Sequence, residues 1–291
     1  MRALVPLLAA ALAATAAVAQ PASAPAPSDD RDPIVYVLED HDSRVTLLGS
    51  VHVLGADAYP LPEEIEAAYA SADAVAFEID MSDLAAIQQA VMSRAGYVGE
   101  RSLRDALGED FALLDSLVVP LGVPVAFLDG VEPWAVQLTI LPLAIQRAGY
   151  DAQYGVDAHF LARAQADGKE RLALETADAQ MAVFDEAPER VQVEMLVETL
   201  REWDALPGEL ARMVAAWERG DEAAIETLFQ DMPEPLRTPL LRDRNAAWVP
   251  QIEAMLARDT DVLVVAGVGH LVGGDSVVAM LRDRGHTVSR R

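Results

Sequence analysis

The sequence predicts an α/β protein with a central mixed, largely parallel sheet flanked by helices, and a helical insertion or cap in the second half. Residues 45–48, 62–72 and 74–80 read as strand, helix and strand with short links, which is typical of a parallel crossover. The run at 262–266 is strongly apolar, as expected of a buried central strand. Residues 178 to about 256 are almost entirely helical in pattern and predict a helical subdomain.

Turn and capping residues mark most other boundaries. The helix at 62–72 opens on a proline and two glutamates, which suit a first turn. A polar turn that contains His41 separates the strand at 34–38 from the next one, so His41 is expected to be a solvated turn residue. The remaining expected elements are helices over 82–94, 101–119, 132–147, 157–166 and 276–284, and strands over 123–128, 171–175 and 287–289.

The N-terminus has the pattern of a secretory signal peptide. A single arginine precedes an apolar run from Ala3 to Val18, and Ala17-Val-Ala19 fits the cleavage rule. This run is short for a membrane-spanning helix, which needs about 20 residues. The sequence therefore predicts a signal peptide over 1–19, a flexible Pro- and Ala-rich linker over 20–33 and a domain over 34–291. We expect a secreted protein, periplasmic or extracellular, with no stable membrane anchor after cleavage.

Composition excludes several classes of function. The formal net charge of −25 disfavours binding to nucleic acid, because an acidic surface repels phosphates. The absence of cysteine excludes disulfides, zinc–thiolate sites and cysteine nucleophiles. Residues 267–273 resemble a dinucleotide-binding glycine loop, but the spacing has one residue too many before the third glycine. There is no Gly-x-Ser-x-Gly or His-Glu-x-x-His motif, so a serine hydrolase and a standard zincin are unsupported.

A repeated pattern carries the chemical signal. Gly49-Ser-Val-His52 and Gly267-Val-Gly-His270 each follow an apolar strand, about two hundred residues apart. A histidine just past the carboxyl end of a strand stands where α/β proteins bind ligands, and neutral imidazole is a common metal ligand. Glu78 follows the third strand at the same edge and could ligate a divalent ion or act as general base. Each residue alone could instead be structural.

Further polar residues fall near the same edge. Asp80 points to the same face as Glu78 if the strand continues, although it could also cap the next helix. Glu175 ends another strand, where a cap or a salt bridge is the alternative. Arg244 and Asn245 are candidates for positioning a substrate and supporting a developing oxyanion, but arginine in a helix is normally on a solvated face.

Taken together, these motifs resemble the TraB/GumN family, which is related to the Tiki metalloproteases. The resemblance covers about residues 34 to 290. The motifs are, in order, Leu48-Gly-Ser-Val-His52, Phe77-Glu-Ile-Asp80, Gly155-Val-Asp157, Leu174-Glu175-Thr-Ala-Asp-Ala-Gln180, Arg244-Asn-Ala-Ala-Trp248 and Gly267-Val-Gly-His270-Leu-Val-Gly273.

The resemblance implies an α/β fold and a metal-dependent site built from His52, Glu78 and His270. Manganese or cobalt is expected ahead of zinc, with Asp157 as an additional candidate ligand. The transmembrane anchor of the animal members is missing here.

The leading expectation is a metal-dependent hydrolase, foremost a peptidase, that acts on a peptide or other small substrate. One alternative is a non-enzymatic protein that binds a peptide or sequesters a signal. Another is a carrier of a metal ion or haem on the same fold. The sequence leaves the oligomeric state open.

Overall fold

The computed structural model describes residues 31–291. The predicted signal peptide, 1–19, and residues 20–30 of the predicted linker lie outside the described residues. No helix within 31–291 is both long enough and apolar enough to cross a membrane.

A mixed, largely parallel sheet of six strands forms the framework, in the order β4-β3-β5-β2-β1-β6. The four strands β4, β3, β5 and β2 are parallel, whereas β1 pairs antiparallel with both β2 and β6. This arrangement confirms the predicted fold class. The strands are β1 (Val35–Glu39), β2 (Arg44–Ser50), β3 (Ala74–Phe77), β4 (Glu170–Ala173), β5 (Val262–Gly267) and β6 (Val288–Arg290).

The register of the parallel strands brings their carboxyl ends to one edge. Strand β2 pairs with β5 from Val45 opposite Val262 to Ser50 opposite Gly267, and Phe77 of β3 lies opposite Val265. Strands β3 and β5 are buried along their whole length, because both have neighbours on each side and helices above and below.

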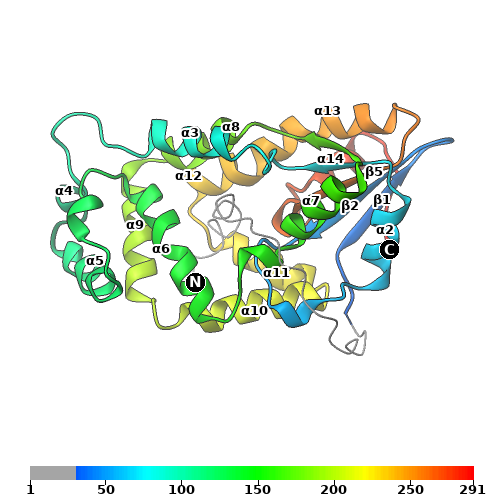
Figure 1. Ribbon diagram of the computed structural model, residues 1–291. Coiled ribbons are helices and arrows are strands. Elements are labelled where there is room, and N and C mark those ends of the chain that lie inside the picture. The colour runs from blue at the N-terminus through cyan, green and yellow to red at the C-terminus, as the bar shows by residue number, and fades with distance from the viewer. Residues whose placement is uncertain (1–30) are drawn as a thin grey trace.

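Two pairs of helices flank the sheet (Figure 1). Helices α2 (Glu63–Ser71) and α7 (Val156–Asp167) pack together, with the rings of Tyr69 and Phe160 stacked at 5.1 Å. Helices α13 (Arg244–Leu256) and α14 (Val277–Asp283) form the other pair. The chain moves in one direction across the sheet from β2 to β3 to β4 and returns from β4 to β5. Because crossovers between parallel strands are right-handed as a rule, the two pairs lie on opposite faces.

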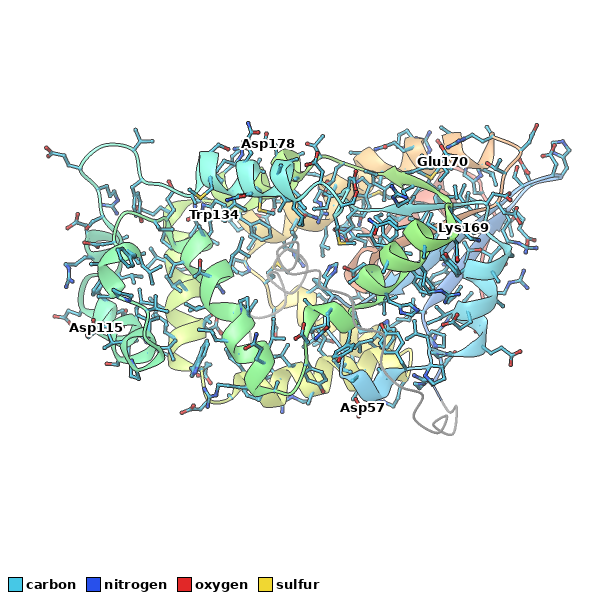
Figure 2. The ribbon with its side chains drawn as sticks, viewed as in Figure 1. Asp57, Asp115, Trp134, Lys169, Glu170 and Asp178 are labelled. Carbon is cyan, nitrogen blue, oxygen red and sulfur yellow. The ribbon has the colours of Figure 1, made fainter. Side chains whose placement is uncertain are left out.

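The other helices extend the molecule away from the sheet. Figure 1 shows α4, α5, α6 and α9 at the end opposite the strands, and in Figure 2 Asp115 marks this end and Glu170 the sheet end. Helix α6 packs on α9 and α10, and α3 packs on α8. The helices after residue 178 therefore pack together with helices that precede it in the sequence. The bounds are α3 (Leu84–Arg94), α4 (Leu103–Leu107), α5 (Phe111–Val118), α6 (Pro133–Arg147), α8 (Ala177–Asp185), α9 (Glu189–Arg201), α10 (Leu206–Glu218), α11 (Glu222–Gln230) and α12 (Glu234–Arg237).

Two expected strands differ from the structure. The prediction of a strand over 123–128 is wrong, because this segment forms a short 3₁₀ helix over Val125–Phe127 with i→i+3 hydrogen bonds. Pro124 has no N–H for a sheet ladder, and the Phe127 side chain is exposed. The third strand ends at Phe77 rather than Asp80, because the chain turns through a bond from the Met81 N–H to the Ile79 carbonyl.

Candidate functional site

Polar side chains follow the carboxyl ends of all four parallel strands. His52 follows β2 and Glu78 follows β3, while Glu175 comes after β4 and His270 after β5. Because the four strands are parallel, these side chains meet at one edge of the sheet, where open α/β sheets bind their ligands. The helices that continue from this edge supply the groups that hold them.

Gly267 lies at the centre of this group. Its N–H donates a hydrogen bond of 2.7 Å to Oε1 of Glu78. A Cβ atom at this position would lie 3.1 Å from Oε1 of Glu78, 3.5 Å from Nε2 of His52 and 3.7 Å from Cδ2 of His270. The three side chains therefore share one space beside the glycine. Their separation is below the distance of about 10 Å that would rule out a common ion.

His52 is positioned by the start of α7. Its Nδ1 lies 3.0 Å from Oδ1 of Asp157, in the first turn of that helix. The helix can approach this closely because Gly155 precedes it, since a Cβ there would lie 2.4 Å from the His52 carbonyl oxygen. Nε2 of His52 is buried and has no hydrogen-bond partner within the described residues. Burial lowers the pKa of His52, but the Asp157 carboxylate outweighs it and raises the pKa to about 9.

His270 is held differently. Its Nδ1 lies 2.6 Å from Oδ1 of Asn245, and Nδ2 of Asn245 donates to the Asp275 carbonyl at 2.8 Å. This second bond fixes the orientation of the amide, so Nδ1 carries the ring proton and Nε2 carries the lone pair. Burial, with the guanidinium of Arg244, lowers the pKa of His270 to about 3. The ring is therefore neutral at physiological pH.

Arg244 fills the space between the strand ends of β3, β4 and β5. Its Nε and Nη2 donate to Glu175 at 3.0 and 2.6 Å, and Nη2 also lies 2.6 Å from Oε2 of Glu78. Its Nη1 donates to the Leu240 carbonyl and lies 3.1 Å from Nε2 of His270. Every N–H of the guanidinium is thus used inside the protein. Its role in binding substrate stays a prediction.

The buried charges around Arg244 are strongly coupled. Burial raises the pKa of Glu78, but Arg244, together with the two histidines and the Gly267 N–H, outweighs this effect and lowers the pKa to about 2. Burial also raises the pKa of Glu175, and here Arg244 only partly opposes it. The pKa of Arg244 is raised because the two carboxylates outweigh its burial. Of these two carboxyl groups, Glu78 is therefore the stronger acid.

Local helix geometry explains the contact between Arg244 and Leu240. Residues Thr238–Asp243 form a π-helical turn directly before α13. A π turn widens the helix, so the Arg244 side chain can fold back to the carbonyl four residues earlier. Arg244 is only 6% exposed, which rules out the solvated helix face as its environment.

The other candidates lie around this centre or outside it. Asp80 is exposed and accepts hydrogen bonds from the N–H and hydroxyl of Ser82, so it does not join the group. Asp157 lies behind His52, and Glu175 lies behind Arg244. Asn245 positions the ring of His270.

Two contacting residues were missed from the sequence. Gln180 of α8 is 4% exposed and donates to Oε2 of Glu78 at 3.0 Å. Trp248 packs against His270 with the ring centroids 4.3 Å apart and the ring planes tilted by 41°, and the guanidinium of Arg244 lies 4.7 Å from the same indole. Gln180 ends one of the quoted motifs, and Trp248 follows Arg244 by four residues on one helix face, so both signals were available.

The fit of a metal ion depends on how closely the predicted ligands approach one another. Within residues 31–291, the one group of three His, Asp or Glu side chains with ligand atoms within 4.8 Å is Asp40, His41 and Asp42, in an exposed turn. The three predicted ligands do not all close to this distance. Nε2 of His270 lies 3.9 Å from Oε1 of Glu78, so the wider separation involves His52. The donors still suit an ion. Nε2 of His52 is free, and a carboxylate holds its other nitrogen, as is usual for metal-binding histidines.

Comparison with known proteins agrees with the motifs. The "uncharacterized protein YbaP" of Escherichia coli (strain K12) is 26% identical to this chain over 238 residues, which is 81% of this chain and 87% of that protein. The protein of the same name from Shigella flexneri matches over the same shares. No solved structure matches the chain significantly. The model of the TraB/PrgY/gumN family matches residues 34–290, so the chain belongs to the TraB/PrgY/gumN family.

Proposed function

We propose that the protein is a metal-dependent hydrolase, foremost a peptidase, with a divalent ion held by His52, Glu78 and His270. The observation that carries the proposal is the buried, unpartnered Nε2 of His52, which faces the space beside Gly267. Leaving a polar atom buried without a partner costs about 1–3 kcal/mol. A ligand that pairs with this nitrogen would offset the cost, and Glu78 supplies the charge that attracts a cation.

The donor set favours an ion that accepts nitrogen and oxygen together. Manganese and cobalt bind imidazole and carboxylate ligands, and no thiolate is present. When bound, such an ion polarises a carbonyl group and makes water a stronger nucleophile at neutral pH.

The chain's own groups have defined tasks in this proposal. Asp157 and Asn245 orient the two imidazoles by their Nδ1 atoms. The Gly267 N–H and Gln180 hold the two oxygens of Glu78, so its carboxylate points into the shared space. Glu78 would be placed to ligate the ion or to take a proton from the attacking water.

The proposal includes export from the cytoplasm. It is supported by the signal-peptide pattern over residues 1–19 alone. N-terminal sequencing of the mature protein from a bacterial host tests it. A mature chain that begins at Gln20 in the periplasm or medium supports export, and an intact Met1 on cytoplasmic protein contradicts it.

Metal analysis and a peptide-cleavage assay test the activity. Purified protein is titrated with Mn²⁺, Co²⁺ and Zn²⁺, and a peptide library is incubated with Mn²⁺ or with chelator. We expect one Mn²⁺ per chain, cleavage that chelator abolishes, and loss of both in His52→Gln and His270→Gln. His286→Gln is the matched control, because its ring contacts Glu253 away from the site.

Two experimental results would contradict the proposal and favour one of the alternatives. Stoichiometric metal binding without any cleavage indicates a carrier. Peptide capture with no metal binding, unchanged in His52→Gln, indicates a binding protein.

A further inference from the structure

The guanidinium of Arg244 occupies the place of a cation in the candidate site. Its Nη2 lies 2.6 Å from Oε2 of Glu78 and its Nη1 lies 3.1 Å from Nε2 of His270. These are two of the three side chains that the proposed function assigns to the ion. Because Nδ1 of His270 carries the ring proton, Nε2 has the only lone pair of that ring, and Arg244 holds it.

The contacts of Arg244 divide into an anchor and a movable part. Glu175 receives both Nε and Nη2, which fixes one edge of the guanidinium. Only Nη1 contacts His270, and its other bond goes to the Leu240 carbonyl within the π-helical turn. The Glu78 contact uses Oε2, so Oε1 beside Gly267 remains available for another ligand. Among the contacts of Arg244, a cation therefore needs to displace only the one to His270.

We propose that Arg244 is an internal competitor of the metal ion, and that the contact of its Nη1 with Nε2 of His270 sets the metal affinity. This inference rests on the proposed function. Without the ion, the guanidinium neutralises Glu78 and covers His270. With the ion, Nη1 withdraws from His270 while Glu175 retains the rest of the side chain.

Trp248 supplies a built-in reporter of this exchange. Its indole contacts both partners, with the His270 ring centroid at 4.3 Å and the Arg244 guanidinium carbon at 4.7 Å. Displacing the guanidinium changes the charge over the indole, so Mn²⁺ binding should change its fluorescence. Trp248→Phe should remove that optical change, while electron paramagnetic resonance of Mn²⁺ still records binding.

The test compares the Mn²⁺ dissociation constants of wild type and Arg244 variants, measured by electron paramagnetic resonance. Arg244→Gln removes the competitor and a positive charge, so we expect binding about 10-fold tighter or more. Arg244→Gln with Glu175→Gln restores the charge balance and should still bind about 3-fold to 10-fold tighter than wild type. The double variant thereby separates the contact from the charge.

A matched control variant and a substitute variant complete the experiment. Arg94 of α3 also bridges two carboxylates, those of Asp178 and Asp185, outside the site. Arg94→Gln should leave the dissociation constant within about 2-fold. If Arg244→Gln does not fold, Arg244→Lys takes its place in the test. This variant keeps the charge but has fewer N–H donors, so it should also bind Mn²⁺ more tightly than wild type.

Each outcome decides the inference. If wild type binds Mn²⁺ through His52 but no folded Arg244 variant binds it more tightly, Arg244 is no competitor and the proposed function stands. If neither wild type nor any variant binds Mn²⁺, the proposed function fails and this inference fails with it.

Discussion

The two Gly-x-x-His units are alike in sequence but have opposite electrostatic environments. Both histidines follow parallel strands that pair directly, and both face Gly267. A carboxylate, Asp157, holds Nδ1 of His52, whereas an amide, Asn245, holds Nδ1 of His270. The pKa is raised to about 9 in the first and lowered to about 3 in the second.

The difference shows how the fold balances charge at one sheet edge. Without another cation, a protonated His52 and Arg244 face the carboxylates of Glu78, Glu175 and Asp157. His270 stays neutral because burial, with the guanidinium of Arg244 in direct contact, lowers its pKa. The sequence repeat thus fixes the position of each histidine, while burial and the charged groups around each ring fix its protonation.

The largest expected effect comes from Gly155→Ala, which disturbs the surroundings of His52 and not those of His270. The new methyl group would lie 2.4 Å from the His52 carbonyl oxygen, so the start of α7 must move away. We expect a loss of about 3 kcal/mol in the free energy of unfolding, measured by urea denaturation. Gly208→Ala, with nothing within 4 Å, should be neutral or slightly stabilising. Equal stability of the two variants would refute the close approach.

Changing the residue behind each ring should move the pKa of that histidine. Asp157→Asn should lower the pKa of His52 from about 9 to below 6.5, because burial then outweighs the remaining attraction of Glu78. Asn245→Asp should raise the pKa of His270 above its value of about 3, at a cost of about 1–3 kcal/mol because Asp275 loses its donor. Imidazole resonances in NMR titrations without metal measure both. A His52 pKa that is unchanged in Asp157→Asn would break the comparison.

The pH dependence of stability should have two windows. Between pH 6.5 and about 9, folded His52 keeps a proton that the unfolded chain releases, so stability falls by about 1–3 kcal/mol as pH rises. Between about pH 3 and pH 6.5, His270 binds a proton in the unfolded chain but not in the folded protein. The free energy of unfolding therefore falls as the pH falls. Denaturation in chelator at several pH values measures both. Asp157→Asn should lose the upper window only, and a variant that keeps it would argue against Asp157 as the cause.

The first glycines of the two Gly-x-x-His units, Gly49 and Gly267, should respond differently to replacement by alanine, with smaller effects. Gly267→Ala places a methyl group in the space shared by His52, Glu78 and His270 and should weaken Mn²⁺ binding about 10-fold or more. Gly49→Ala meets the Val268 side chain at 2.9 Å instead, so it should cost about 1–3 kcal/mol of stability and leave metal affinity within about 2-fold. Equal loss of Mn²⁺ affinity in both variants would mean that the shared space is not the binding site.

The hydrophobic pattern of the sequence predicted the sheet and its flanking helices, because each strand and each crossover helix is a continuous segment with its own pattern. The fold class follows from the apolar runs that became β2, β3 and β5. The prediction at 123–128 failed because an apolar run beside Pro124 and Gly122 cannot be distinguished from a strand without its neighbours.

The internal organisation of the site was beyond the sequence for a different reason. Arg244 reaches Glu78 from far along the chain, and its path depends on a π-helical turn that no residue pattern marks. The partners behind His52 and His270 also come from distant helices, so their protonation could not be read from the repeat.

Anomalous diffraction from crystals grown with Mn²⁺ tests the central claim most directly. The account predicts one peak beside Gly267, bonded to Nε2 of His52, Oε1 of Glu78 and Nε2 of His270, with Nη1 of Arg244 withdrawn from His270. A fully loaded crystal whose only peak lies at the exposed turn of Asp40, His41 and Asp42, with Arg244 still on His270, would contradict it.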